Sequence, residues 1–187
     1  MDSKSFTPQE SLDLISKVIS DARQNFKDDG IIYIMWGILT TLAGAGQFVL
    51  LQLEYYSINY FPYFIMPIGG IISCIYYMKK EKRTSNTISK LVGTIWFAVM
   101  TNNLILGFVF STQLQDTLSA IILIFIGVGT LASGTALKEK VLLISGISIN
   151  LLGLSCFFID WEYHPLIIAL TGFFFTLIPG IILNKKK

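Results

Sequence analysis

Charged residues are scarce in this sequence. Asp, Glu, Lys and Arg make up 14% of its 187 residues, whereas a soluble domain carries roughly a quarter. Hydrophobic residues make up 53%, and the mean hydropathy is +0.64. This composition excludes an ordinary soluble domain and a disordered chain, and a count of two cysteines excludes a disulfide scaffold. The shortage of charge predicts an integral membrane protein.

The apolar residues fall into six segments of roughly 20 residues, the length that crosses a bilayer as a helix. We therefore expect an all-α membrane protein with six transmembrane helices in a compact bundle, preceded by a cytoplasmic amphipathic helix. The predicted spans are residues 31–53, 60–78, 88–110, 117–137, 141–159 and 164–183. The predicted division of the chain is 1–30 for the amphipathic helix, 31–184 for the transmembrane domain and 185–187 for a basic cytoplasmic tail.

Lys and Arg are missing from every loop on one side of the predicted bundle. All 14 basic residues lie in the amino-terminal segment, the loop after the second span, the turn after the fourth span and the tail. Six spans put these segments on one side, which the positive-inside rule assigns to the cytoplasm. We expect a multi-pass protein of the cell (inner) membrane with both termini cytoplasmic. Cys74 and Cys156 lie at opposite depths, so we expect no disulfide between them.

The amino-terminal segment contains the one substantial water-facing element. Thr7, Pro8 and Glu10 match a capping box with proline at the first helical position, so a helix should start there and end near Gly30. Its apolar residues recur at intervals of three and four and form one stripe along the helix. The stripe consists of Leu12, Ile15, Ile19, Ala22 and Phe26. The sequence does not decide which of four surfaces this stripe packs against: the membrane surface, its own bundle, a second copy of the chain, or another cytoplasmic protein.

Ionisable residues are absent from the interiors of the predicted spans, which disfavours ion-coupled pumps, proton relays and voltage sensors. Four neutral amides lie there instead, and helical rise puts them at similar depths. They are Gln47, Asn102, Asn103 and Asn150. Their favoured role is to bond helices together beside small residues such as Gly146 and Gly153. The alternative is a polar layer along a pathway for a small neutral solute. Other spans also carry faces of small residues at which we expect helices to pack closely, and these faces include Gly37, Gly70, Gly107, Gly129 and Gly172.

Two prolines and a set of glycines suggest further features of the spans. Pro67 and Pro179 fall within the second and sixth spans, where we expect each to kink the helix. Gly37, Gly93 and Gly146 each lie about six residues into an odd-numbered span. Hairpins of equal length produce such a period by themselves, so the glycines do not establish an internal repeat.

Two arrangements resemble enzyme sites, and both fail on geometry or chemistry. Ser133-Gly134 resembles the rhomboid protease motif, but the one histidine, His164, should lie about 25 Å away across the membrane, beyond reach of a nucleophile. Asp160, Glu162 and His164 match no zinc signature. We therefore expect no catalytic residues, no metal, no cofactor and no nucleic-acid partner.

Several short motifs together resemble a family of uncharacterised small six-span membrane proteins of the Bacteroidota. They are the Thr7-Pro8-Gln9-Glu10-Ser11-Leu12 helix start with its end at Phe26, Trp36-Gly37, Ser133-Gly134 followed by Leu137-Lys138, Gly146-Ile147 and Pro179-Gly180. That family has no assigned reaction, and its members are often encoded near winged-helix transcription regulators. The resemblance implies a regulatory or envelope-stress context and transfers no functional residue.

These observations favour a non-enzymatic membrane protein that acts through protein contacts, as an accessory, regulatory or signalling subunit. Its partners would be the bilayer and, through the amino-terminal helix, a second copy of the chain or a cytoplasmic protein. The alternative function is a channel or transporter for a small neutral solute.

Overall fold

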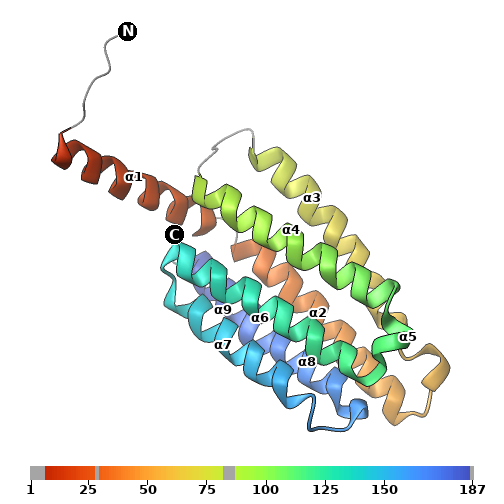
Figure 1. Cartoon of the computed structure of the whole chain (residues 1–187). Coiled ribbons are helices and arrows are strands. Elements are labelled where there is room, and N and C mark those ends of the chain that lie inside the picture. The colour runs from red at the N-terminus through yellow and green to blue at the C-terminus, as the bar shows by residue number, and fades with distance from the viewer. Residues whose placement is uncertain (1–6, 28–29, 82–86, 186–187) are drawn as a thin grey trace.

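The computed structural model describes residues 7–27, 30–81 and 87–185, and all the secondary structure in these ranges is helical (Figure 1). Five segments are long and apolar enough to cross a membrane, and they indicate a multi-pass membrane protein. These candidate spans are Gly30–Gln52, Tyr56–Tyr76, Lys90–Phe108, Ser111–Leu137 and Trp161–Lys185.

The helices after α1 (Pro8–Lys27) run back and forth along one common direction (Figure 1). In chain order they are α2 Gly30–Gln52, α3 Met66–Glu81, α4 Thr87–Phe108, α5 Ser111–Leu114, α6 Leu118–Leu137, α7 Lys140–Ser155, α8 His164–Gly172 and α9 Ile178–Lys185. Shorter helical turns join them: η1 Tyr56–Ile58, η2 Phe61–Ile65, η3 Gln115–Thr117, η4 Trp161–Tyr163 and the π-helix η5 Phe173–Leu177.

The predicted fifth span, 141–159, is shorter in the structure. Helix α7 ends at Ser155, and residues 156–159 form turns and bends. Sixteen residues rise about 24 Å as an α-helix, less than the bilayer core of about 30 Å. By length and composition, five segments of the described chain therefore qualify as spans, and α7 is an additional short apolar helix.

The structure gives each of the two prolines a role other than the predicted kink. Pro67 is the second residue of α3 and follows the 3-10 turn η2, so it begins the helix at a position where no intrahelical donor is required. Pro179 follows η5. Because Pro179 has no N–H for the carbonyl of Phe175, the preceding turn widens, and the N–H of Ile178 bonds to the carbonyl of Phe173.

Glycines bring two pairs of helices into backbone contact. A Cβ on Gly146 of α7 would lie 2.5 Å from the backbone nitrogen of Leu131 in α6. A Cβ on Gly37 of α2 would lie 2.5 Å from the backbone of Leu177. The predicted small faces are thus confirmed where α6 meets α7 and where α2 meets the segment from α8 to α9. The prediction is wrong for Gly70 and Gly107, because such a Cβ has no neighbour within 4 Å among the described residues.

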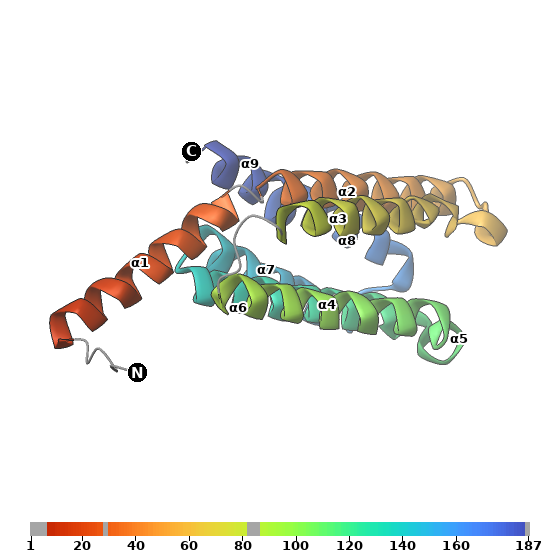
Figure 2. The same cartoon turned by 90° about the horizontal axis from the view of Figure 1, so that it is seen from above.

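Two hairpins repeat the same interhelical contacts. In α2 and α3, Trp36 Nε1 donates to Ser73 Oγ, and Gly69 lies against Leu39. In α4 and α6, Trp96 Nε1 donates to Ser133 Oγ, and Gly129 lies against Val99. One constant shift along the sequence relates all four residues of the first set to those of the second. Viewed from above, the first hairpin lies on one side of the bundle and the second on the other (Figure 2).

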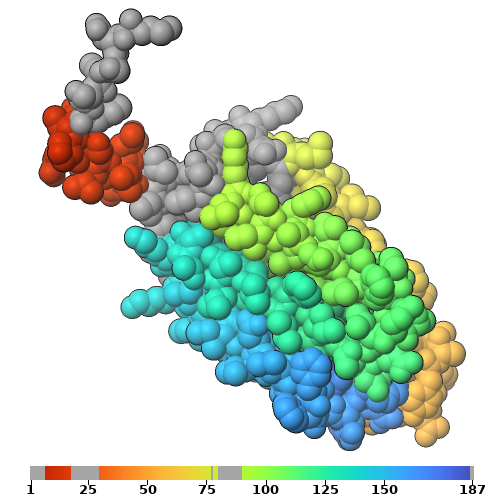
Figure 3. Space-filling view, in the orientation of Figure 1, coloured from red at the N-terminus to blue at the C-terminus, as the bar shows by residue number. Residues whose placement is uncertain are grey.

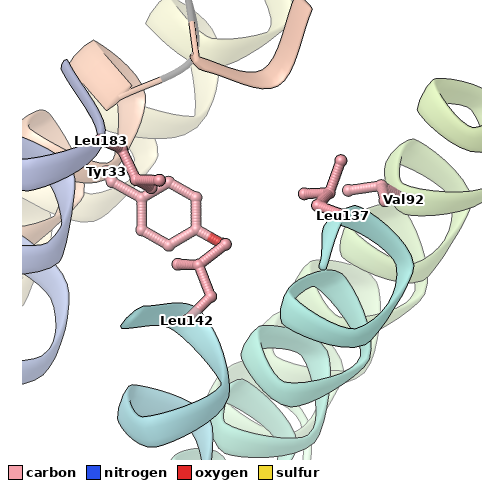
Figure 4. Close-up of a cluster of buried hydrophobic side chains, with 5 residues drawn as sticks. All are labelled: Tyr33, Val92, Leu137, Leu142 and Leu183. Atoms are coloured by element: carbon pink, nitrogen blue, oxygen red, sulfur yellow. The ribbon is translucent and has the colours of Figure 1, made fainter. Parts of the chain in front are cut away.

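A buried cluster joins the two sides near the ends of α2 and α9. Tyr33 of α2 packs with Leu183 of α9, and its ring reaches toward Leu142 of α7 (Figure 4). The same cluster contains Leu137 and Val92, which lie together in Figure 4. The ring of Tyr33 also meets Trp96 edge-on, with centroids 6.1 Å apart. Five helices therefore meet at the end of the bundle that carries the basic residues.

Candidate functional site

The helix that bears the predicted apolar stripe has the cap that the sequence predicts. This stripe, called the α1 stripe from here on, consists of Leu12, Ile15, Ile19, Ala22 and Phe26. The backbone N–H and the hydroxyl of Thr7 both donate to Glu10 Oε2, at 2.8 and 2.9 Å. Thr7 Oγ1 accepts from the N–H of Glu10 at 3.3 Å. The backbone bond and then the side-chain bond from Thr7 hold the pKa of the Glu10 carboxyl below its ordinary value. The predicted capping box is confirmed, and it fixes the start of α1 at Pro8.

Helix α1 contacts α4 and α6 but projects away from the bundle (Figures 1 and 2). Leu12 is 61% exposed and Ile15 is 56% exposed, so the bundle does not cover this part of the α1 stripe. The side chains of Ile19, Ala22 and Phe26 lie outside the described residues. Leu14, which belongs to a different face of α1, is also exposed. The described part of the stripe is thus available to another surface.

Gln47 lies near the carboxyl end of α2, far from α1, and forms a buried polar pair with Asn59. Its Nε2 donates to Asn59 Oδ1 at 2.9 Å, and Asn59 Nδ2 donates to the carbonyl of Tyr56 at 2.6 Å. Both side chains are buried. Because Gln47 donates to Asn59 and Asn59 donates to the loop backbone, the two bonds tie the loop between α2 and α3 to α2. Asn59 was not predicted as a partner, since it lies in a loop outside every predicted periodic segment.

Asn150 lies at the contact between α7 and α6. Its Nδ2 donates to the carbonyl of Gly146 at 2.8 Å, and a Cβ on Gly127 would lie 2.5 Å from that nitrogen. Only a glycine at 127 leaves room for the amide. Asn150 therefore lies between two closely packed helices beside small residues, but its hydrogen bond stays within α7 and does not cross to α6 as the predicted role requires.

Asn102 and Asn103 are neighbours on α4 that point in different directions. Asn102 is exposed, and its Nδ2 donates to the carbonyl of Ala98 at 2.8 Å. Asn103 is partly buried, and its Oδ1 has no hydrogen-bond partner among the described residues. The structure thus gives Gln47, Asn102 and Asn150 separate hydrogen-bond partners. No hydrogen bond within the described chain joins any two of the four predicted amides.

The residues that resemble enzyme sites are engaged elsewhere. Ser133 Oγ donates to the carbonyl of Gly129 and accepts from Trp96 Nε1, whereas His164 Nε2 lies 2.9 Å from the carbonyl oxygen of Ile159. No group of three His, Cys, Asp or Glu side chains with metal-binding proximity occurs in residues 7–27, 30–81 and 87–185. Cys74 and Cys156 are both free thiols, as predicted.

Two features of the structure were not predicted from the sequence: the burial of Glu139 and the repeated Trp–Ser hydrogen bond. Glu139 is 5% exposed at the tight turn between α6 and α7, a burial that its position between two lysines does not indicate. The repeated Trp–Ser contact was also missed, because the spacing of Gly37, Gly93 and Gly146 does not reveal it. The signal is present in the sequence, because the shift that aligns Trp36 with Trp96 also aligns Ser73 with Ser133 and Gly69 with Gly129.

Comparison of the chain with protein-family models, curated proteins and solved structures finds no match.

Proposed function

We propose that this protein is a non-enzymatic membrane protein that acts through protein contacts, with the α1 stripe as the contact surface. The observation that carries the proposal is the exposure of Leu12 and Ile15 on a helix that projects from the bundle. Burying one such side chain is worth roughly 1.5 to 3 kcal/mol, so this face has a strong tendency to pair with another apolar surface. Residues 1–29 contain six acidic and four basic groups, and this balance gives little attraction to anionic lipid.

The proposed topology has six spans, with α7 as the fifth and both termini in the cytoplasm. The turn between α6 and α7 makes these helices antiparallel neighbours along their length (Figure 1). A bilayer accommodates a short helix by local thinning, and apolar residues 156–159 extend the segment. The distribution of Lys and Arg supports a cytoplasmic location for the end of the bundle that bears α1.

A regulatory or accessory role suits this architecture best. The resemblance to the Bacteroidota family, whose members are often encoded near winged-helix regulators, supports a regulatory setting in the inner membrane. The alternative of a solute channel receives less support, because a continuous polar path needs neighbouring amides. The hydrogen bonds of Gln47, Asn102 and Asn150 each lead to a different partner.

A photo-crosslinking amino acid at position 15 tests the proposal in intact cells. We expect a discrete protein adduct, and its mass distinguishes a second copy from a different protein. The same amino acid at position 14 is the matched control, because Leu14 is similarly exposed but lies off the α1 stripe. Adducts to lipid alone at position 15, or identical adducts at both positions, would contradict the proposal.

A further inference from the structure

Asn102 presents an amide to lipid within a candidate span. It lies about 9 Å along the helix axis from Phe108 at one end of α4 and about 22 Å from Thr87 at the other. The side chain is exposed and makes one hydrogen bond, to the carbonyl of Ala98. An amide has two N–H donors and a carbonyl oxygen, so one donor and the oxygen have no partner among the described residues. No water is available at this depth to satisfy them.

The same face of α4 carries a regular seam. Its members recur at alternating intervals of four and three residues, the spacing with which two helices pack along their length. This α4 seam consists of Leu91, Ile95, Ala98, Asn102 and Ile105. Leu91, Ala98, Asn102 and Ile105 are exposed, and Ile95 is partly exposed. No other described segment covers the face that α4 and α6 present in Figure 3.

A shallow groove of about 480 Å³ runs beside the seam, between α4 and α6. Leu91 and Ile95 form one wall. Helix α6 forms the other, with Val128 and Leu131 beside the smaller Ala132, Thr135 and Ala136. Small residues allow the backbone of another helix to approach closely. The groove and the seam therefore form one continuous surface suited to a helix.

We propose that a second copy of this chain packs its α4 along this surface, with the two Asn102 amides bonded to each other. Membrane topology requires both copies to enter the bilayer in the same orientation, so the two α4 helices are parallel and residue 102 meets residue 102 at equal depth. An amide is self-complementary, since each copy offers the donor and the acceptor that the other lacks. A lipid acyl chain also fits an apolar groove but bonds to neither group. The choice of a second copy over lipid therefore depends on Asn102.

Cysteine crosslinking in native membranes tests this interface. In a background with Cys74→Ser and Cys156→Ser, Ala98→Cys and Ile105→Cys should form a covalent dimer on oxidation. Phe97→Cys and Leu104→Cys are matched controls, because both residues are exposed on α4 at nearly the same depths but lie off the seam. They should crosslink weakly. Equal crosslinking on and off the seam, or no dimer at any position, would overturn the proposal, and the second result would leave lipid as the occupant.

Substitution of Asn102 gives an independent test. Asn102→Leu should weaken dimerisation by about tenfold, in line with interhelical amide bonds in model membrane helices, while thermal stability of the monomer stays unchanged. Asn102→Gln keeps the amide and should keep the dimer. Crosslinking of Ala98→Cys that is unaffected by Asn102→Leu would contradict the inference. A variant with serine at positions 12 and 15 should still dimerise through α4, which separates this result from the α1 proposal.

Discussion

Trp96 donates its indole N–H to the hydroxyl of Ser133 at 3.0 Å and thereby joins α4 to α6. Trp36 and Ser73 make the same bond, also at 3.0 Å, between α2 and α3. Because the same bond recurs at the equivalent position of both hairpins, we regard it as part of the architecture of each hairpin.

A double-mutant cycle with Trp96→Phe and Ser133→Ala should reveal this bond. We expect a coupling free energy of about 0.6 kcal/mol, the average for interhelical hydrogen bonds in a membrane protein. The coupling is measured from the unfolding of the four proteins in detergent. The cycle with Trp36→Phe and Ser73→Ala should give a similar value, whereas strictly additive effects in both cycles would argue against a structural role.

Gly146→Ala should destabilise the protein by about 1 to 3 kcal/mol, the usual cost of overpacking. The new Cβ would lie 2.5 Å from the backbone of Leu131 and would force α6 and α7 apart. Gly93→Ala is the control, because its Cβ would have no neighbour within 4 Å among the residues that the structure describes. Its effect should stay within about 0.5 kcal/mol. Thermal unfolding in detergent measures both, and equal effects would contradict the assigned packing.

The cap of α1 should lose its stabilising effect in acid. Since hydrogen bonds from Thr7 lower the pKa of Glu10 in the folded helix, the cap is fully formed above the ordinary glutamate pKa of about 4.3. It is lost as the pH falls through the lower folded value. A carbon NMR titration of the Glu10 carboxyl should give a pKa that Thr7→Ala raises and that Ser11→Ala leaves unchanged. A pKa insensitive to Thr7→Ala would disprove the side-chain contribution.

The proposed orientation predicts which positions an impermeant thiol reagent reaches. In the background that lacks Cys74 and Cys156, cysteines at Ser57 and Thr112 should react when the reagent is added outside intact cells. A cysteine at Lys140 should react only after the cells are permeabilised. All three native side chains are exposed, so accessibility to the reagent should depend on the side of the membrane. Labelling at position 140 in intact cells would reverse the orientation.

The helices and the α1 cap were predictable from the sequence, because each depends on residues that are close together in the chain. Long apolar segments in a bilayer must be helical, and the Thr7–Glu10 pairing follows from residues three apart. The Gln47–Asn59 pair was not predictable, because the path of a loop decides it. The π-helix before Pro179 was also missed, because the sequence shows that Pro179 removes an N–H but not whether the helix kinks or widens its preceding turn in response. Nor could a single sequence show that Asn102 is exposed whereas Asn103 is partly buried.

The central claim, that the protein acts through the α1 stripe, is tested most directly by replacing Leu12 and Ile15 together with serine. The complex mass in mild detergent and the melting temperature are then measured on the same sample. Leu14→Ser is the control for loss of an exposed apolar side chain elsewhere on α1. We predict that the double variant loses bound partner mass while its melting temperature stays unchanged, because the bundle does not cover these side chains. A lower melting temperature with unchanged complex mass would contradict the account and assign the stripe to the stability of the bundle itself.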